Sequence, residues 1–333
     1  MASPTPVDLP DVNVAAPDPT QNTGSTAPYA KRIIQLTFTL AGSGSNSGGG
    51  AGGNTLTISG LRTFVTIVMA SFPGGAVATI RVFGMTLSHI NLLTKAGTSF
   101  ITNAGNKISV AAGDVGGAIS TIFTGIIKEA KPTFNNMPDC AFVVEAISIE
   151  DLVMTVTPPV TFPGQVTVEQ ALTQVLKPVG VTLKNNGVNV TLQSPYFPGG
   201  VWQQVSKIVQ AANCAAAYDG TSKTFTISPK YGAATAENPA VISPATGMIG
   251  YPEFETAFIR VRTLFVPGVL VKAQSVIKVV SQLTAANGMW NAFEVTYNIS
   301  AEAPGGPWEM IVSGSPVVAK DQPTALAGAA ASY

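Results

Sequence analysis

Residue types that could carry catalysis are few in this chain. His89 is the only histidine, so a Ser-His-Asp triad, a Cys-His pair or an imidazole-metal site would have to include it. It lies in the segment Thr86–Ile90, beside an apolar stripe at helical spacing. We therefore expect a surface or packed histidine rather than a catalytic one. Without a second histidine or clustered cysteines, we expect no zinc site.

Pairs of carboxylates could still act as the acid and base of a glycosidase. The candidates by residue type are Glu145, Glu150-Asp151, and Glu253 with Glu255. None lies in a recognisable motif, and the exposed faces of strands explain them more simply. We predict that the protein is not an enzyme, with no catalytic, cofactor-binding or metal-binding residues and no cofactor.

One other segment resembles a binding motif. The run Ala41–Gly50 has the glycine spacing of a phosphate loop, but it lacks the Gly-Lys-Ser/Thr ending and is followed by strand-like residues,. We interpret it as a flexible hairpin loop.

Cys140 and Cys214 belong to no CxxC pattern and are interpreted as small core residues, although a disulfide between them is possible,.

The composition points to assembly. The chain has 333 residues, of which 46% are apolar and only 11% charged, against a usual charged share of about 25%. So little charge favours burial against other subunits, although a surface coated with Thr, Ser, Asn and Gln is the alternative.

Eighteen basic residues balance 18 acidic ones. Without a basic footprint, stable nucleic-acid binding is not expected, and near-neutrality suits packing between copies.

Targeting signals are not evident. The longest apolar runs, such as Phe64–Ala70, fall short of the roughly 18 residues that a membrane span requires,. No basic residue precedes Lys31 and no apolar signal core is present, so a secretory signal is not expected,. We expect no membrane span and folding in the cytoplasm of the cell that makes the protein.

The first half of the chain predicts an arm followed by a β domain. Residues 1–30 are rich in Pro, Asp and Thr and poor in large apolar side chains, which predicts an extended arm that orders on a neighbour, or a disordered tail,. Over residues 31–160 the apolar period is two, as in Ile34–Leu40, which predicts an antiparallel barrel or sandwich. Thr86–Thr94 is the exception, a short helix capped by Thr86. The other predicted strands are Leu56–Ile58, Arg62–Met69, Ala76–Phe83, Lys107–Val110, Ala118–Ile127 and Ala141–Ile149.

Residues 161–235 predict an α+β domain built from two αββ units. Thr167–Gln170 matches a capping box that begins a helix ending near Lys177,. A hairpin is then expected around Asn185-Asn186-Gly187, because Asn-Gly favours tight turns. The order recurs in a helix over Val201–Asn213 and strands around an Asp219-Gly220 turn,.

Residues 236–320 predict a second β domain, and residues 321–333 a loose, Ala-rich tail. The expected strands are Phe254–Leu264, Leu270–Val279, Asn291–Ile299 and Trp308–Val312. Trp202, Trp290 and Trp308 are not interleaved with basic residues, so we interpret them as core or interface anchors. The fold class predicted is mainly β with an α+β insert.

Several segments resemble the baseplate hub or tail hub family of tailed phages across residues 30–315. They are Arg81–Leu87, Asn186–Val188 with Pro195–Gly199, Ile242–Pro252 and Pro304–Trp308. The resemblance implies two tail-tube-like antiparallel β-barrel domains flanking the αββ-repeat domain. It also implies a homotrimeric, pseudo-sixfold ring that continues the tail tube. It transfers no catalytic residue, and neither the N-terminal arm nor the Gly/Ser loop maps onto the family.

The function expected is a structural hub in the virion baseplate, assembled in the bacterial cytoplasm. It would join the tail tube or distal tail protein to a tip, spike or fibre-anchoring protein. Its channel would hold the tape measure protein and pass DNA without specific binding. The alternative is a cell-wall- or carbohydrate-binding tail protein, possibly with weak hydrolase activity. A capsid or decoration protein is disfavoured by the αββ repeat.

Overall fold

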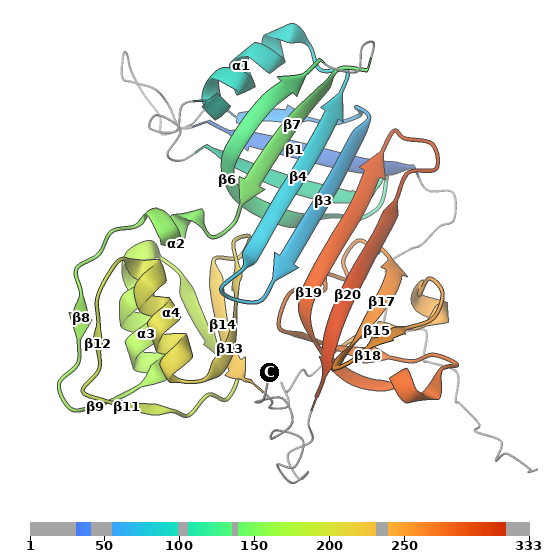
Figure 1. Ribbon diagram of the computed structural model, residues 1–333. Coiled ribbons are helices and arrows are strands. Elements are labelled where there is room, and N and C mark those ends of the chain that lie inside the picture. The colour runs from blue at the N-terminus through green and yellow to red at the C-terminus, as the bar shows by residue number, and fades with distance from the viewer. Residues whose placement is uncertain (1–30, 41–54, 99–105, 135–138, 231–238, 318–333) are drawn as a thin grey trace, which may run out of the picture.

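The computed structural model describes residues 31–40, 55–98, 106–134, 139–230 and 239–317. The predicted N-terminal arm (1–30), Gly/Ser run (41–50) and C-terminal tail (321–333) lie outside the described residues. The described chain is mostly β with large antiparallel sheets, which confirms the predicted fold class (Figure 1).

The first β segment, from β1 to β7, alternates buried and exposed residues as predicted. Each strand-like run of the sequence corresponds to a strand, and the one helix packs against β6. The elements are β1 (Arg32–Thr39), β2 (Thr55–Ile58), β3 (Thr63–Ala70), β4 (Gly75–Phe83), α1 (Leu87–Thr98), β5 (Lys107–Asp114), β6 (Ile119–Thr133) and β7 (Ala141–Ile147).

The α+β module, from α2 to β14, follows with its own hydrophobic core. Its elements are α2 (Glu150–Met154), β8 (Val160–Thr161), β9 (Gln165–Thr167), α3 (Val168–Leu176), β10 (Thr182–Asn185), β11 (Thr191–Gln193), β12 (Tyr196–Phe197), α4 (Val201–Ala211), β13 (Cys214–Asp219) and β14 (Thr224–Pro229).

The second β segment, from β15 to β20, returns to strands. Two predictions here were wrong in detail. The run Phe254–Leu264 is split by a turn, and Leu270–Val279 is a strand only from Ser275, because Gln274 has a φ of 64° that turns the chain. The strands are β15 (Ala240–Ile242), β16 (Glu253–Glu255), β17 (Phe258–Leu264), β18 (Ser275–Val279), β19 (Gly288–Ala301) and β20 (Trp308–Pro316).

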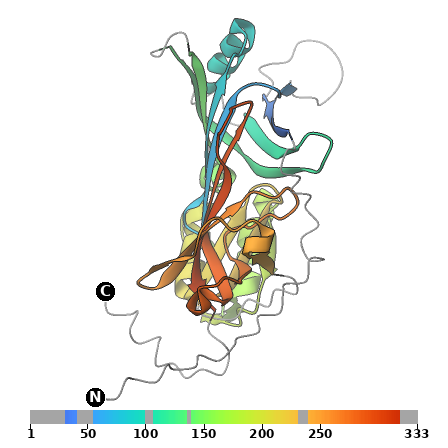
Figure 2. The ribbon, with the colours of Figure 1, turned by 90° about the vertical axis from the view of Figure 1, so that its right-hand side faces the viewer.

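Strands from both β segments form one sheet. β3 pairs antiparallel with β19 from Thr63–Ala301 to Ala70–Glu294. Eight strands therefore run in the order β16-β17-β20-β19-β3-β4-β7-β6, four from each segment. We call these eight strands the wall. They cross the front of Figure 1, and in Figure 2 they are seen edge-on with β1 and β5 to one side.

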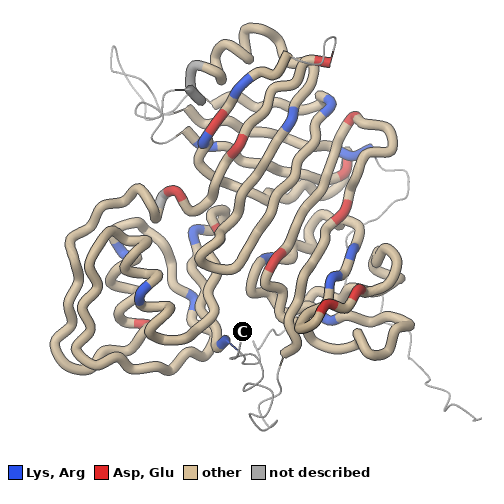
Figure 3. The backbone as a smooth tube through the Cα atoms, in the orientation of Figure 1, with Lys and Arg blue, Asp and Glu red and all other residues tan. Residues whose placement is uncertain are grey.

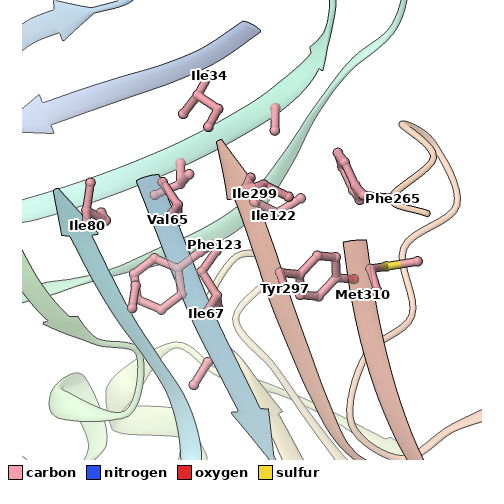
Figure 4. Packing of buried hydrophobic residues seen from close by; sticks show 14 of the residues in the cluster. Ile34, Val65, Ile67, Ile80, Ile122, Phe123, Phe265, Tyr297, Ile299 and Met310 are labelled. Atoms are coloured by element: carbon pink, nitrogen blue, oxygen red, sulfur yellow. The ribbon is translucent and has the colours of Figure 1, made fainter. Parts of the chain in front are cut away.

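The side of the wall that faces β1 and β5 carries the main core. Side chains that alternate along the wall strands are fully buried there, and residues from β1 and β6 pack over them. Tyr297 is fully buried among them, and its hydroxyl donates a 2.7 Å hydrogen bond to the Val271 carbonyl. Burial raises the pKa of this phenol far above its usual value. Figure 4 shows Ile34, Val65, Ile67, Ile80, Ile122, Phe123, Phe265, Tyr297, Ile299 and Met310 in contact across the two segments.

The module confirms the predicted capping box. The Thr167 hydroxyl accepts from the Gln170 amide at 3.2 Å, and the Gln170 side chain accepts from the Thr167 amide at 3.2 Å. This satisfies two donors at the start of α3 that have no partner inside the helix. The second αββ unit is also present, since β13 and β14 form an antiparallel hairpin after α4.

The hairpin predicted at Asn185-Asn186-Gly187 was wrong. The chain does turn there, because the Asn185 side chain accepts from the amides of Gly187 and Val188. However, β10 pairs in parallel with β14, and β11 pairs with β9. A lone two-stranded hairpin is marginally stable. Pairing with β14 places β10 in a three-stranded sheet, so this distant contact prevails over the local turn signal.

Replacing Thr167 with alanine should lower the free energy of unfolding by about 1 kcal/mol, because the start of α3 loses its cap. Urea unfolding of the full chain followed by circular dichroism measures this change. Thr173→Ala is the matched control, since the exposed Thr173 hydroxyl only donates to the Glu169 carbonyl inside the helix. Equal losses in the two variants would contradict a stabilising cap.

Candidate functional site

The residues with catalytic potential are not brought together. His89 lies half-buried in α1, near the start of that helix, where its amide donates to the Thr86 hydroxyl at 3.3 Å. This bond confirms Thr86 as a capping residue. Among the described residues, no group of three or more His, Cys, Asp or Glu is placed to hold a metal ion.

The candidate carboxylates are spread over three places. Glu145 is on β7, Glu150 begins α2, and Glu253 and Glu255 are exposed on β16. Sequence reasoning missed Glu129, which lies directly opposite Glu145 across β6 and β7. A β-bulge between Ile127 and Glu129 sets that register, and the even alternation assumed for the strand could not reveal it.

Glu129 and Glu145 form a small ion cluster with Lys131. The Lys131 ammonium donates to Glu129 at 2.8 Å. That hydrogen bond and the charge of Glu129, with a smaller contribution from Glu145, raise the pKa of the exposed Lys131. The arrangement is that of a solvated ion pair on a sheet.

The cysteines and tryptophans largely match their interpretation as packing residues. Cys140 and Cys214 are both free and half-buried, and burial raises the pKa of the Cys214 thiol. Trp308 is buried against Phe265. Trp202 and Trp290 are partly buried against the module core and the main core, respectively.

A broad surface, the free face of the wall, is left open by the fold. We use this name for the side chains of the eight wall strands that point away from the main core. For example, Val65 and Ile67 are buried, whereas Thr66 between them is exposed. The strand register aligns one row across both segments: Leu264, Glu309, Asn298, Thr66, Thr79, Glu145 and Glu129.

Charged residues on the free face are sparse, as Figure 3 shows, and most of them form ion pairs. Ion pairs join Arg260 to Glu255 at 2.9 Å, Arg262 to Glu309 at 2.8 Å, and Lys131 to Glu129 at 2.8 Å. Arg81 is an exposed cation of this face without an ion pair in the described part of the chain. The face is therefore large, nearly neutral and rich in Thr and Val.

The α+β module is fixed to the wall by the β3–β4 hairpin. Phe72, at the tip of the hairpin, packs against Trp202 with ring centroids 4.4 Å apart and against Phe225 at 5.3 Å. Its amide donates to the Ala216 carbonyl at 2.7 Å, at the edge of β13. The tip of a wall hairpin thus takes part in the core of the module.

A buried polar cluster joins all three parts at the base of this hairpin. The Gln274 side chain donates to the Ser71 hydroxyl at 2.8 Å and accepts from Ser228 at 3.1 Å and from Asn291 at 2.9 Å. Ser71 belongs to the hairpin, Ser228 to β14 and Asn291 to β19. Because hydrogen bonds depend steeply on geometry, this cluster fixes the module relative to both β segments.

An ion pair adds to the same junction, beside a cavity of about 970 Å³ lined by all three parts. The Lys272 ammonium lies 2.5 Å from the Asp219 carboxylate, which also accepts from Ser222 at 2.7 Å. Burial disfavours charge on Asp219. The hydrogen bonds from Lys272 and Ser222, with the charge of Lys272, outweigh this and hold the pKa of Asp219 below its usual value.

Comparison with protein families identifies the chain. The family model for baseplate hub gp41 matches residues 33–304. The chain belongs to this family. Membership makes the protein a structural component of a phage tail baseplate. No curated protein sequence matches it significantly.

Two of the solved structures that resemble this baseplate hub are tail proteins. The tail protein of Neisseria meningitidis MC58 is 11% identical, with a TM-score of 0.57 over 85% of this chain and 96% of that one. The 43 kDa tail protein of prophage MuSo2 from Shewanella oneidensis is 10% identical, with a TM-score of 0.53 over 86% and 99%. A chain of the lidded Francisella PdpA-VgrG complex is 7% identical, with a TM-score of 0.51 over 86% and 53%. At these identities the likeness shows a shared fold.

No described helix is long and apolar enough to cross a membrane.

Replacing Asp219 with asparagine should destabilise the hub by about 1 kcal/mol at neutral pH, the order expected for a half-exposed ion pair with added hydrogen bonds. The folded pKa is depressed, so the ionised carboxylate stabilises the fold above its unfolded pKa of about 3.9. That contribution is lost as the pH falls through the lower folded pKa. Urea unfolding of both proteins at pH 7 and below about pH 3 measures the difference, and a constant difference would contradict the assignment.

Proposed function

We propose that the protein is a non-enzymatic hub subunit, three copies of which form a pseudo-sixfold ring in the baseplate. The ring joins the tail tube or distal tail protein to the tip, spike or fibre-anchoring protein. Its open centre is the channel for the tape measure protein and for DNA. This proposal rests on the wall, the eight strands that the two β segments contribute to one sheet.

The composition of the wall supports pseudo-sixfold symmetry. One half consists of β3, β4, β7 and β6 from the first β segment, and the other of β19, β20, β17 and β16 from the second. A single chain therefore supplies two four-stranded halves, and three chains supply six around an axis. Joining them end to end would leave few open strand edges, which is how closed barrels avoid uncontrolled pairing.

The free face of the wall suits a channel lining. DNA is held by contacts between cations and its phosphates. Here Arg260, Arg262 and Lys131 each bind a carboxylate of the same face, which reduces the positive field available to a passing polyanion. We infer that the free face lines the channel and that DNA passes it without specific binding.

The family and the fold support the proposed axial partners. The chain belongs to a baseplate hub family, and its fold is shared with a chain of a PdpA-VgrG complex, which is itself a multi-protein assembly. We place the tail tube or distal tail protein on one side of the ring and the tip or spike on the other. The module, fixed rigidly at the junction, is a natural platform for one of these contacts.

Electron microscopy of the concentrated, purified full chain tests the ring. The expected classes are threefold rings with six similar lobes and an open centre. Rings of another symmetry, or monomers at every concentration, would contradict the proposal.

Removing the paired carboxylates tests the channel lining. Glu129→Gln with Glu309→Gln frees Lys131 and Arg262, so the assembled ring should retain duplex DNA at least severalfold better at low salt, with the gain lost as salt rises. A filter-binding assay over a salt series measures this. Glu302→Gln is the control, because it frees Lys31 just before β1, off the free face. An equal gain from the control would place the DNA contact elsewhere.

A further inference from the structure

The wall ends in two different surfaces. At one end, β16 pairs with β17 and with no other described strand, so its other edge has no strand partner in the described part of the chain,. All three of its residues are exposed, and Phe254 keeps 51% of its surface. Tyr251, just before the strand, is 64% exposed. We call Tyr251–Glu255 the acidic end, because Glu253 and Glu255 are its charged residues.

The two carboxylates of the acidic end differ in whether they form an ion pair. Glu255 forms an ion pair with Arg260 of the neighbouring strand at 2.9 Å. Glu253 has no ion pair with any described residue. An edge strand with exposed aromatic side chains and a free carboxylate is an incomplete surface, because soluble proteins rarely leave such edges uncovered.

At the other end of the wall lies the second half of β6, beyond Ile126, where the pairing of β6 with β5 ends. The helix α1 packs against β6. We call this the basic end: Leu87, Leu92, Lys128, Lys131 and Phe134. Leu87 is 69% exposed, at the start of α1, and Phe134 is 47% exposed, just after β6.

Lys128 is the free charge of the basic end. It is the extra residue of the bulge between Ile127 and Glu129 and has no cross-strand partner in the pairing with β7. Its side chain is exposed and forms no ion pair with any described residue. Because a bulge redirects the side chain it carries, Lys128 falls outside the regular alternation of β6.

We propose that the acidic end of one copy binds the basic end of the next, with Glu253 facing Lys128. Tyr251 and Phe254 pack against the apolar side chains around Leu87 and Phe134. The two surfaces differ and lie at opposite ends of the wall, so the contact is heterologous and can be repeated by rotation until it closes. The inference rests on the proposed ring and names the surfaces that form it.

The two kinds of contact have different roles. The exposed aromatic and aliphatic side chains supply most of the attraction, because burying apolar area is the main favourable term in association. The single pair of opposite charges fixes the register and disfavours the pairing of two like ends. Two acidic ends would bring Glu253 against Glu253, so dimers around a twofold axis are opposed.

A charge exchange tests the contact. Lys128→Glu and Glu253→Lys should each weaken association on the order of tenfold, since each places like charges together. The double variant should restore the wild-type population of rings to within about threefold. Sedimentation velocity of the full chain over a concentration series measures the ring fraction, and electron microscopy confirms the symmetry of the restored species.

Matched variants separate this contact from general effects of charge or folding. Lys207→Glu makes the same change at an exposed site of α4 and should leave the ring fraction unchanged. Phe254→Ser should weaken the ring, whereas Tyr196→Ser, at a 60% exposed residue of β12, should not. Circular dichroism of each monomer confirms that the fold is intact.

The outcomes distinguish this inference from the function on which it rests. Rings that form in the wild type and tolerate both single charge reversals would overturn the proposed contact while leaving the hub function intact. A wild-type chain that never forms rings would overturn the ring itself. Rescue by the double variant is the result expected only if Lys128 and Glu253 meet.

Discussion

The pairing of β3 with β19 is the constraint on which the rest of the structure depends. It joins the first and second β segments into one sheet and gives them a common core. Without it, the chain would have two smaller sheets, each with an additional open edge. With it, β6 and β16 become the ends of one continuous wall, and the free face becomes a single surface.

The α+β module depends on the same pairing. Its fixed position comes from Phe72 at the hairpin tip and from Gln274, which bonds to the hairpin, to β14 and to β19. These partners converge because β3 and β19 run side by side, as the bond from Ser71 to the Phe293 carbonyl at 2.9 Å shows. A buried amide with several partners accepts little displacement, since each lost bond leaves a polar group unsatisfied.

Local features of the sequence predicted most elements but not how they pair. Alternation found the strands of the first β segment, and the capping box at Thr167 found the start of α3, because both signals are contained in a few neighbouring residues. The Asn185–Gly187 signal failed because β10 obtains its partner from a segment some forty residues further along the chain. Pairing of β3 with β19 had no local signature either.

The candidate surfaces, too, could be predicted only in part from the sequence. The low charge was visible in the composition and indicated assembly, but the residues that form the two ends of the wall were not identified. Glu253 was noted only as a possible catalytic carboxylate, and Lys128 and Glu129 were not singled out. Their positions depend on a bulge in β6 and on which strands lie at the ends of the wall, and both are properties of the folded chain.

The separate core of the module has a consequence for the order of folding. Its contacts are relatively local, whereas Ser71 and Phe293 are separated by 222 positions. Contacts between distant residues form slowly, because a long loop must close first. During synthesis the module can therefore fold while the wall still lacks β19. The unpaired edge of β3 stays exposed until the last strands emerge, which makes this interval the period of greatest risk of aggregation.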